Sequence, residues 1–261
     1  MEMEPKRDRN LRLNNIYQFK IFSNFKNLVH LVTKREISKP LENSLALHTG
    51  EDSTLILKNR EGLNKSLNMD IVLANQTHSS NIEIIRDKRS RGWADEKSAI
   101  RDCDGLITDV KGLLVGILTA DCVPILIFDH KKEIVGAVHA GWRGTKEEIA
   151  KKSIEKMLKE FNSNPKDILV GIAPSIRGCC YEVDFNVAKY FLDYKNSISN
   201  LKNGKYMLDL AKVNIAQLKE VGVLEKNIED SYICTCCEYN NYFSYRKTAC
   251  SGRFLSAIGL K

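Results

Sequence analysis

The stretch that decides the fold is Leu113–Ala140, which reads LLVGILTADCVPILIFDHKKEIVGAVHA. It holds two continuous apolar runs, Leu113–Leu118 and Val123–Phe128, then a polar turn at Asp129–Lys132 and a third apolar run at Ile134–Val138. Continuous apolar runs of this length are typical of strands that are buried on both faces of a sheet. We therefore predict three buried strands in this stretch.

Strands and helices are also predicted on both sides of it. Thr145 is followed three residues later by Glu148, which is a capping-box pattern, and apolar residues then recur at helical spacing as far as Phe161. Strands and helices alternate without a clear linker, which predicts one α/β domain over residues 16–261 after a loose, flexible polar segment, 1–15. Further strands are predicted within 16–33 and at 71–74, 82–85, 168–172, 231–234, 242–245 and 254–260, and further helices at 186–194 and 210–221.

Composition and charge narrow the class of protein. The chain has 261 residues, of which 43% are hydrophobic, enough for a substantial core. Its net charge of +7 is spread along the chain, which suits small anions and gives no support for nucleic-acid or membrane partners. The longest apolar stretch is broken by Asp121 and Pro124, and the first residues lack the apolar core of a secretory signal. We expect a cytoplasmic protein.

The cysteines are expected to be free thiols in such a compartment. The only Cys-x-x-Cys spacing is Cys234–Cys237, and no second such pair or paired histidine motif accompanies it, which argues against a structural zinc site there. The adjacent Cys179 and Cys180 are interpreted as two buried thiols. The eight cysteines are Cys103, Cys122, Cys179, Cys180, Cys234, Cys236, Cys237 and Cys250.

Three residues that can bind a metal fall near predicted strand ends: His78, Cys122 and His139. Two imidazoles and one thiolate form a three-ligand zinc set with an open fourth position, which is the catalytic arrangement. The alternatives are a core cysteine at position 122 and a surface histidine at position 78. In an extended strand Asp121 and Cys122 would point to opposite faces, so both can serve one pocket only if the backbone is irregular there.

The segment that follows the third strand, His139–Thr145, can form an anion cradle. Its two glycines allow a sharp turn, the start of a helix offers free N–H groups, and Arg143 adds a planar fork that suits phosphate. An ordinary strand-to-helix turn with a solvated arginine explains the segment slightly better when it is taken alone. Trp142 either stacks on a purine or serves packing. His48 is interpreted as a loop residue, with lining of the site as the less favoured alternative.

Several longer motifs together resemble the laccase-domain family, once described as multicopper polyphenol oxidases and now understood as purine nucleoside phosphorylases. The resemblance covers roughly His48–Leu260, and the chain departs from the usual residues of that family at Ser79, Cys103 and Lys247. The motifs are H-T-G-E-D with N-R (48–52, 59–60), A-N-Q-T-H (74–78), C-D-G-L-I-T-D (103–109), L-T-A-D-C-V-P-I-L-I-F-D (118–129), V-G-A-V-H-A-G-W-R-G-T (135–145), G-I-A-P-S-I (171–176), C-Y-E-V (180–183), C-T (234–235), Y-F-S-Y-R (242–246) and S-G-R (251–253).

The resemblance implies a single α/β domain with layered α/β/β/α architecture and mixed sheets. It implies one active-site metal, zinc with copper as the alternative, whose ligands fall on His78, Cys122 and His139. The implied reactions are phosphorolysis of adenosine, inosine and methylthioadenosine and hydrolytic deamination of adenosine. The partners are then small molecules, purine nucleosides and phosphate, with no nucleic acid and no membrane.

Roles for individual residues follow as hypotheses. Cys122, Asp121 and Arg143 are the expected catalytic residues, with Asp121 as a proton shuttle. Arg60, Arg143 and Arg246 are expected to hold the phosphate.

Other functions stay open at this point. Cys122 and His139 could be the nucleophile and base of an amidase that acts on peptidoglycan precursors. Copper-dependent phenol oxidation is a further alternative, although five histidines are too few for multicopper chemistry. A metal-dependent scaffold or a thiol-based redox module is the non-enzymatic alternative.

Overall fold

The computed structural model of the chain describes residues 15–201, 203–249 and 252–261. The predicted flexible segment falls on residues 1–14, outside this range, apart from Asn15. The three predicted strands of the central stretch are confirmed as β6 (Leu113–Thr119), β7 (Val123–Asp129) and β8 (Ile134–Ala140), and every residue of them is buried. β7 and β8 pair as an antiparallel hairpin, whereas β6 belongs to a different sheet.

Two large mixed sheets are built around these strands. The first is five-stranded, in the order β1-β2-β14-β6-β3, and β3 is parallel to β6. The second is six-stranded, in the order β13-β9-β7-β8-β5-β4, with parallel pairs at both edges. The remaining strands of the two sheets are β1 (Ile16–Tyr17), β2 (Leu28–Thr33), β3 (Asp70–Leu73), β4 (Ile82–Ile85), β5 (Gly105–Thr108), β9 (Ile168–Ile172), β13 (Ile228–Asp230) and β14 (Phe254–Leu260).

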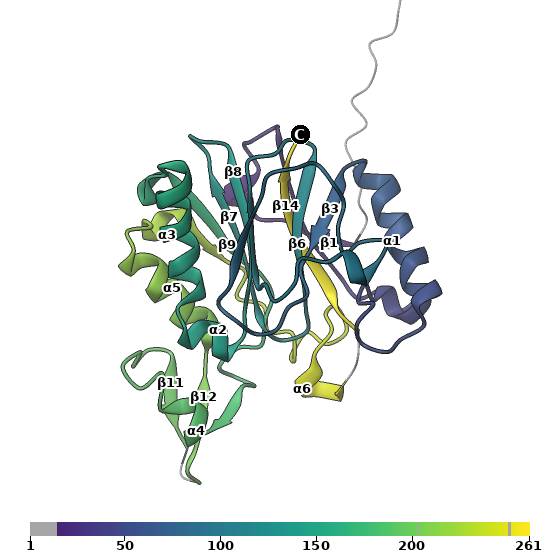
Figure 1. The fold of residues 1–261 in the computed structure, drawn as a ribbon. Coiled ribbons are helices and arrows are strands. Elements are labelled where there is room, and N and C mark those ends of the chain that lie inside the picture. Colours follow the sequence, from purple (N-terminus) through teal and green to yellow (C-terminus); the bar gives the residue numbers. More distant parts are fainter. Residues whose placement is uncertain (1–14, 202, 250–251) are drawn as a thin grey trace, which may run out of the picture.

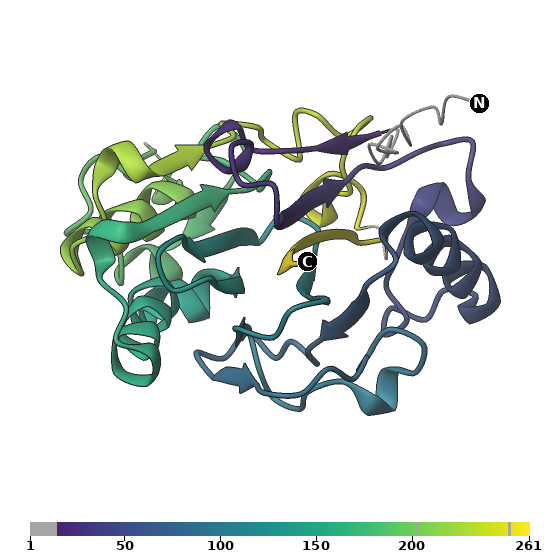
Figure 2. The same cartoon turned by 90° about the horizontal axis from the view of Figure 1, so that it is seen from above.

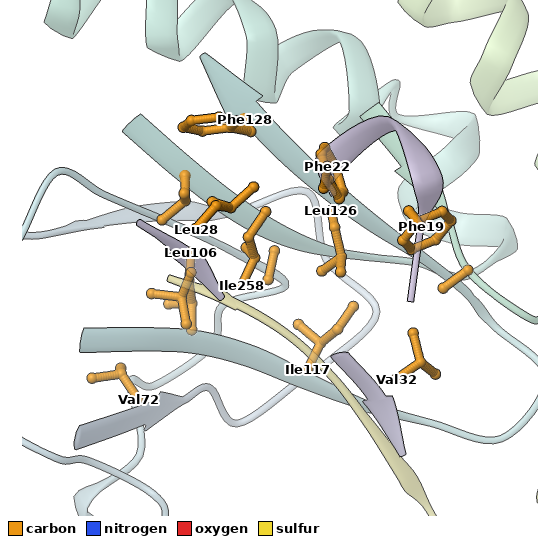
Figure 3. Packing of buried hydrophobic residues seen from close by; sticks show 14 of the residues in the cluster. Phe19, Phe22, Leu28, Val32, Val72, Leu106, Ile117, Leu126, Phe128 and Ile258 are labelled. Atoms are coloured by element: carbon orange, nitrogen blue, oxygen red, sulfur yellow. The ribbon is translucent and has the colours of Figure 1, made fainter. Parts of the chain in front are cut away.

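One large apolar core lies between the two sheets. Val32, Ile117 and Ile258 of the five-stranded sheet face Leu126 and Phe128 of the six-stranded sheet in one apolar cluster (Figure 3). The short helix η1 (Lys20–Phe22) contributes Phe22 to this cluster, and its N-cap residue Phe19 joins it there. Burial of this apolar surface stabilises the packing of the two sheets by about 25 cal/mol per Å².

Helices cover the two outer faces. α3 (Ile149–Phe161) and α5 (Leu210–Glu220) pack on the six-stranded sheet, and α1 (Ser53–Leu67) packs on the five-stranded sheet. Figures 1 and 2 show the resulting order of helix, sheet, sheet and helix. The predicted fold class, a single α/β domain with layered α/β/β/α architecture and mixed sheets, is confirmed.

Smaller elements complete the described part of the chain. A three-stranded sheet lies below α2 and α5 at the lower left of Figure 1. Its strands are β10 (Glu182–Asp184), β11 (Ile198–Asn200) and β12 (Lys205–Leu208), and the short elements nearby and elsewhere are α2 (Trp142–Lys146), α4 (Phe185–Ala188), α6 (Tyr245–Thr248), η2 (Pro40–Asn43), η3 (Glu96–Ser98), η4 (Pro165–Asp167) and η5 (Glu225–Asn227).

The predicted capping box is wrong. Thr145 lies inside α2, and α3 begins only at Ile149, after Glu148 adopts a left-handed backbone with φ 59°. The Thr145 side chain is buried and its hydroxyl accepts a hydrogen bond from the Asn214 amide at 3.0 Å. The Thr145 hydroxyl therefore binds Asn214 of α5, 69 residues away in sequence, and does not cap a helix.

Other predicted elements are shorter, displaced or absent. The helix predicted at 186–194 is reduced to α4, which ends at Ala188. The strand predicted at 231–234 is wrong, because the parallel partner of β9 is β13. Residues 242–244 form no strand and lead directly into α6. α1 was not predicted, although Asp52 caps it by accepting from the N–H groups of Thr54 and Leu55.

No helix in residues 15–201, 203–249 or 252–261 has both the length and the apolar character needed to cross a bilayer.

Candidate active site

The strands β6 and β7 are consecutive in the chain but belong to different sheets, and the chain passes from one to the other at one end of the two packed sheets. The chain leaves β6 in the five-stranded sheet at Thr119 and enters β7 in the six-stranded sheet at Val123, so Ala120–Cys122 crosses between the sheets. A cavity of about 430 Å³ opens at this end, and its lining includes Tyr245 and Arg246 of α6, the helix labelled near the bottom of Figure 1. Its lining residues are His48, Gln76, His78, Leu118, Thr119, Ala120, Asp121, Cys122, His139, Ile176, Tyr181, Tyr245, Arg246 and Arg253.

The three predicted metal-binding residues lie together in this cavity. One ligand atom from each of His78, Cys122 and His139 lies within 4.8 Å of the others, and Cys122 Sγ is 3.8 Å from His78 Nε2. The two imidazole rings are 4.8 Å apart between centroids and nearly perpendicular. His139 is buried, Cys122 is half-buried and His78 is exposed, so the group is reachable from one side. Two imidazoles and a thiol at this spacing form a donor set that suits a divalent zinc or copper ion.

A fully buried carboxylate, Asp104, links two members of this group. Its Oδ1 lies 2.6 Å from His139 Nδ1, and its backbone carbonyl accepts from the His139 N–H at 2.7 Å. The same Oδ1 accepts from the backbone N–H of His78 at 3.1 Å. The contact with Nδ1 leaves His139 Nε2 as the nitrogen available for a ligand, which is the arrangement found around metal-bound histidines.

The loop that carries His78 is shaped by the same carboxylate. Asp104 Oδ2 accepts from the N–H groups of Thr77 and Ser79 and from the Ser79 hydroxyl. Gln76 fixes the start of the loop with two hydrogen bonds to the backbone of Leu118. His78 itself has a left-handed backbone with φ 61°, and these hydrogen bonds offset the cost of that conformation.

Glycine is required beside the group at position 141. A Cβ atom built there would lie 2.7 Å from His78 Cδ2 and 3.3 Å from Cys122 Sγ. The first distance is shorter than any real contact of a Cβ atom, so the close approach of β8 and the His78 loop depends on the missing side chain.

The backbone between β6 and β7 is irregular, as the sequence analysis required. Asp121 has a φ of 94°, and both Asp121 and Cys122 line the cavity. The Asp121 carboxylate accepts from the Thr235 hydroxyl at 2.7 Å and from the Arg246 N–H at 2.6 Å. It therefore ties the segment that carries Arg246 to the crossing between the sheets.

The electrostatics of the group favour a thiolate next to an imidazolium when no metal is bound. Burial alone would raise the pKa of Cys122, but the charge and hydrogen bonds of His139 and His78 outweigh it and lower the pKa to about 6. Burial would lower the pKa of His139, and Cys122 and Asp104 together raise it to about 9. For Asp104, burial is outweighed by His139 and Ser79, which hold its pKa at about 2. The Cys122 thiol is therefore largely deprotonated at neutral pH.

Other lining residues of the cavity are aromatic or cationic. Arg246 lies 5.3 Å from the centroid of the Tyr181 ring, and its guanidinium donates to the carbonyls of Cys180 and Glu182. Those two hydrogen bonds use two of the five N–H donors of an arginine. Tyr245 and Arg253 also line the cavity; Tyr245 has 59% of its surface exposed, and Arg253 directly precedes β14. Aromatic rings beside arginines can bind a flat base and an anion together.

The other predicted anion-binding residues lie elsewhere. Arg60 is buried on α1, and its guanidinium donates to the carbonyls of Leu45, Gly92 and Trp93, so it holds loops together. Arg143 is exposed and lies 4.5 Å from the centroid of the Trp142 ring. Neither arginine is among the lining residues of the cavity.

The structure also bears on the interpretations of Trp142 and of the adjacent Cys179 and Cys180. Trp142 is half-buried and stacks on Tyr190 with ring centroids 6.4 Å apart, away from the cavity, which favours the packing alternative. The interpretation of Cys179 and Cys180 as buried thiols is wrong, because Cys179 is exposed and Cys180 half-buried in the loop after β9.

Sequence reasoning gave no role to several residues of the site. Asp104, Tyr181, Tyr245 and Arg253 all lie in motifs that carry the family resemblance, and His48 lines the cavity, which was the less favoured alternative. The motifs were the available signal. Only the tertiary structure shows that Tyr181, Tyr245, Arg253 and His48 line one cavity and that Asp104 hydrogen-bonds to His139 and His78.

The comparisons with known proteins agree with this architecture. The model of a family described as "Multi-copper polyphenol oxidoreductase laccase" matches residues 29–261. The chain is 33% identical over 233 residues to purine nucleoside phosphorylase YlmD of Bacillus subtilis, which covers 85% of this chain and 84% of that protein. It is also 33% identical over 225 residues to adenosine deaminase RL5 of an unknown prokaryotic organism, with coverage of 82% and 86%.

Solved structures show the same fold. The crystal structure of YlmD from Geobacillus stearothermophilus superposes with a TM-score of 0.89 at 32% identity and covers 95% of this chain and 97% of that one. Bacillus licheniformis protein YfiH, described as hypothetical, superposes with a TM-score of 0.90 at 31% identity, with coverage of 96% and 98%. The sequence match and the shared fold show that this chain belongs to the multi-copper polyphenol oxidoreductase laccase family.

Proposed function

We propose that this protein is a zinc-dependent purine nucleoside phosphorylase that also deaminates adenosine. The observation that carries the proposal is the convergence of His78, Cys122 and His139 in a cavity that also contains Arg246 and two tyrosines. The relatives named purine nucleoside phosphorylase and adenosine deaminase support the choice of substrate and reactions. The protein's expected setting is the cytoplasm, where cysteine thiols stay reduced.

The donor set fits a zinc ion. His78 Nε2, Cys122 Sγ and His139 Nε2 would hold it, and Asp104 would orient His139 and shape the His78 loop. A bound zinc ion supplies Lewis acidity at neutral pH, which can activate water or polarise an oxygen of the substrate. Copper is the alternative ion, since imidazole and thiolate also suit it.

The rest of the cavity accounts for binding and orientation. Tyr181 and Tyr245 would bind the purine ring by stacking, while Arg246 and Arg253 would hold phosphate close to the ribose. Positioning of two reactants contributes up to roughly 7–11 kcal/mol in favourable cases. We leave Arg60 and Arg143 out of this set because neither lines the cavity. Asp121 would position Arg246 through its hydrogen bond to the Arg246 N–H, and proton transfer by Asp121 stays a prediction.

The test is to incubate the protein with adenosine, with and without phosphate, and to separate the products by chromatography. Phosphorolysis yields adenine and ribose 1-phosphate only when phosphate is present, whereas deamination yields inosine in both cases. We expect chelation to abolish both reactions and added zinc to restore them. Cys122→Ala should be inactive, and Cys103→Ala, which removes a buried thiol outside the cavity, should keep wild-type activity. Full activity of the metal-free Cys122→Ala variant would refute the proposal.

One contact favours a second candidate, hydrolysis of an amide by a cysteine nucleophile. The short contact between Asp104 and His139, with Cys122 on the other side of the imidazole, resembles a nucleophile, base and orienting residue. The expected substrate is then a peptidoglycan precursor. Such an enzyme would keep its activity after chelation and lose it after alkylation, which distinguishes the two candidates.

A further inference from the structure

Four cysteines outside the active-site cavity lie close together. Cys179 and Cys180 belong to the loop after β9, and Cys234 and Cys237 belong to the segment after β13. Their four sulfur atoms all lie within 4.8 Å of one another. Cys237 Sγ is 3.7 Å from Cys179 Sγ and 3.4 Å from Cys180 Sγ.

The fold holds both segments in place independently of these sulfurs. The N–H of Ser175 donates to the Ile233 carbonyl, and the N–H of Thr235 donates back to the Ser175 carbonyl, so the two segments run side by side. Arg177 of the first segment is buried and forms ion pairs with Asp209 and with Asp230, the last residue of β13, which leads into the second segment. The backbone thus brings the cysteines together from positions about 55 residues apart, as in the pair Cys180 and Cys237, which are separated by 57.

The distances fit a tetrahedral ion better than disulfides. With Zn–S bonds of about 2.3 Å, tetrahedral geometry places the sulfurs about 3.8 Å apart, close to the 3.4 and 3.7 Å observed. A disulfide needs about 2.05 Å and joins only two sulfurs, so it would leave the other two thiols of the group unused. Four cysteines from two short segments are a usual donor set for structural zinc.

We propose that Cys179, Cys180, Cys234 and Cys237 bind a structural zinc ion that is separate from the His78, Cys122 and His139 group. The sequence analysis argued against zinc at Cys234–Cys237 because no second pair was recognised. The adjacent Cys179 and Cys180 supply that pair.

This second site would stabilise one wall of the cavity. The loop with Cys179 and Cys180 also carries Ile176 and Tyr181, which line the cavity. The segment with Cys234 carries Thr235, whose hydroxyl donates to Asp121. A bound ion joins these two segments covalently and so restrains both sides of that wall.

The test measures bound zinc by mass spectrometry of the metal in protein purified with zinc and a thiol reductant. We expect the double variant Cys179→Ser/Cys237→Ser, in which both replaced side chains are exposed, to bind one zinc ion per chain fewer than the wild type. Cys236→Ser is the matched control, because Cys236 lies within the same segment but outside the group of four, and it should lose no zinc. An unchanged zinc content in the double variant would overturn the proposal.

Cobalt substitution keeps the proposal testable if the double variant does not fold. Cys122→Ala retains all four cysteines, so it should still bind cobalt and show the strong sulfur-to-metal absorption of a tetrahedral thiolate site. Absence of this absorption in the reduced, folded Cys122→Ala protein would likewise overturn the proposal. A failure of the zinc site at His78, Cys122 and His139 would leave both results unaffected.

Discussion

Substitution of Asp104 by Asn tests how the site is organised. The carboxylate receives hydrogen bonds on both oxygens: Oδ1 from His139 Nδ1 and the His78 N–H, and Oδ2 from the N–H groups of Thr77 and Ser79. Asn replaces one of the two carboxylate oxygens by an NH₂ group, which is itself a donor and cannot accept the hydrogen bonds that this oxygen receives. If it faces His139, the imidazole is driven towards the tautomer with Nε2 protonated, which cannot bind a metal.

The magnitude follows from the contacts that are lost. Loss of a partner that orients a metal-bound histidine typically lowers metal affinity by about 10- to 100-fold. With the NH₂ group facing His139, the backbone N–H of His78 loses its acceptor, and we expect the free energy of unfolding to fall by about 1–3 kcal/mol. The two effects share one cause and should appear together.

The assay is competition for zinc with a coloured chelator, in which the titration of the Cys122→Ala variant is subtracted to isolate the active-site ion. Urea unfolding of the metal-free proteins gives the stability. Asp102→Asn is the matched control, because Asp102 is an exposed carboxylate in the same segment that accepts from Thr77 and Asn81 but does not contact His139. Zinc affinity of Asp104→Asn within twofold of the wild type would refute the role given to Asp104.

Three further predictions concern packing, pH and buried charge. Gly141→Ala should lower zinc affinity at least tenfold, because the new Cβ displaces His78, whereas Gly62→Ala on α1, with nothing within 4 Å, should leave it unchanged in the same competition assay. Burial lowers the pKa of His30 from 6.5 to about 4 in the folded protein. Between these two pH values His30 binds a proton in the unfolded chain but not in the folded protein, so the free energy of unfolding should fall as the pH drops from 6.5 to 4. Urea unfolding between pH 6.5 and 4 should show that the free energy of unfolding of the wild type falls by up to about 3 kcal/mol more than that of His30→Gln. The same dependence on pH in both proteins would contradict the prediction. Arg177→Met should lower the free energy of unfolding by about 3–5 kcal/mol, because it leaves the buried carboxylates of Asp209 and Asp230 without their cation. A loss below about 1 kcal/mol, the size measured for solvent-exposed ion pairs, would contradict this prediction.

The fold could be predicted where the signal is local. The apolar runs of β6, β7 and β8 are continuous in sequence, and burial on both faces follows from them directly. The start of α3 could not be predicted in the same way. Thr145 looks like a helix cap in sequence, but its hydroxyl bonds to Asn214 on α5, and no local pattern shows that contact.

The site shows the same limit. His78, Cys122 and His139 were identified by residue type, position at strand ends and family motifs, and the structure brings them together. Arg60 was selected as an anion-binding residue because a guanidinium suits phosphate. Its N–H groups donate to loop carbonyls instead, which only the tertiary structure shows. Asp104 was missed because its importance comes from contacts with residues 25 to 35 positions away.

Anomalous diffraction at the zinc absorption edge, from crystals grown with zinc, tests the central claim most directly. We expect a peak about 2.0–2.1 Å from Nε2 of both His78 and His139 and about 2.3 Å from Cys122 Sγ. No peak between these three side chains in zinc-saturated crystals, or a Cys122 sulfur turned away from both imidazoles, would contradict the account.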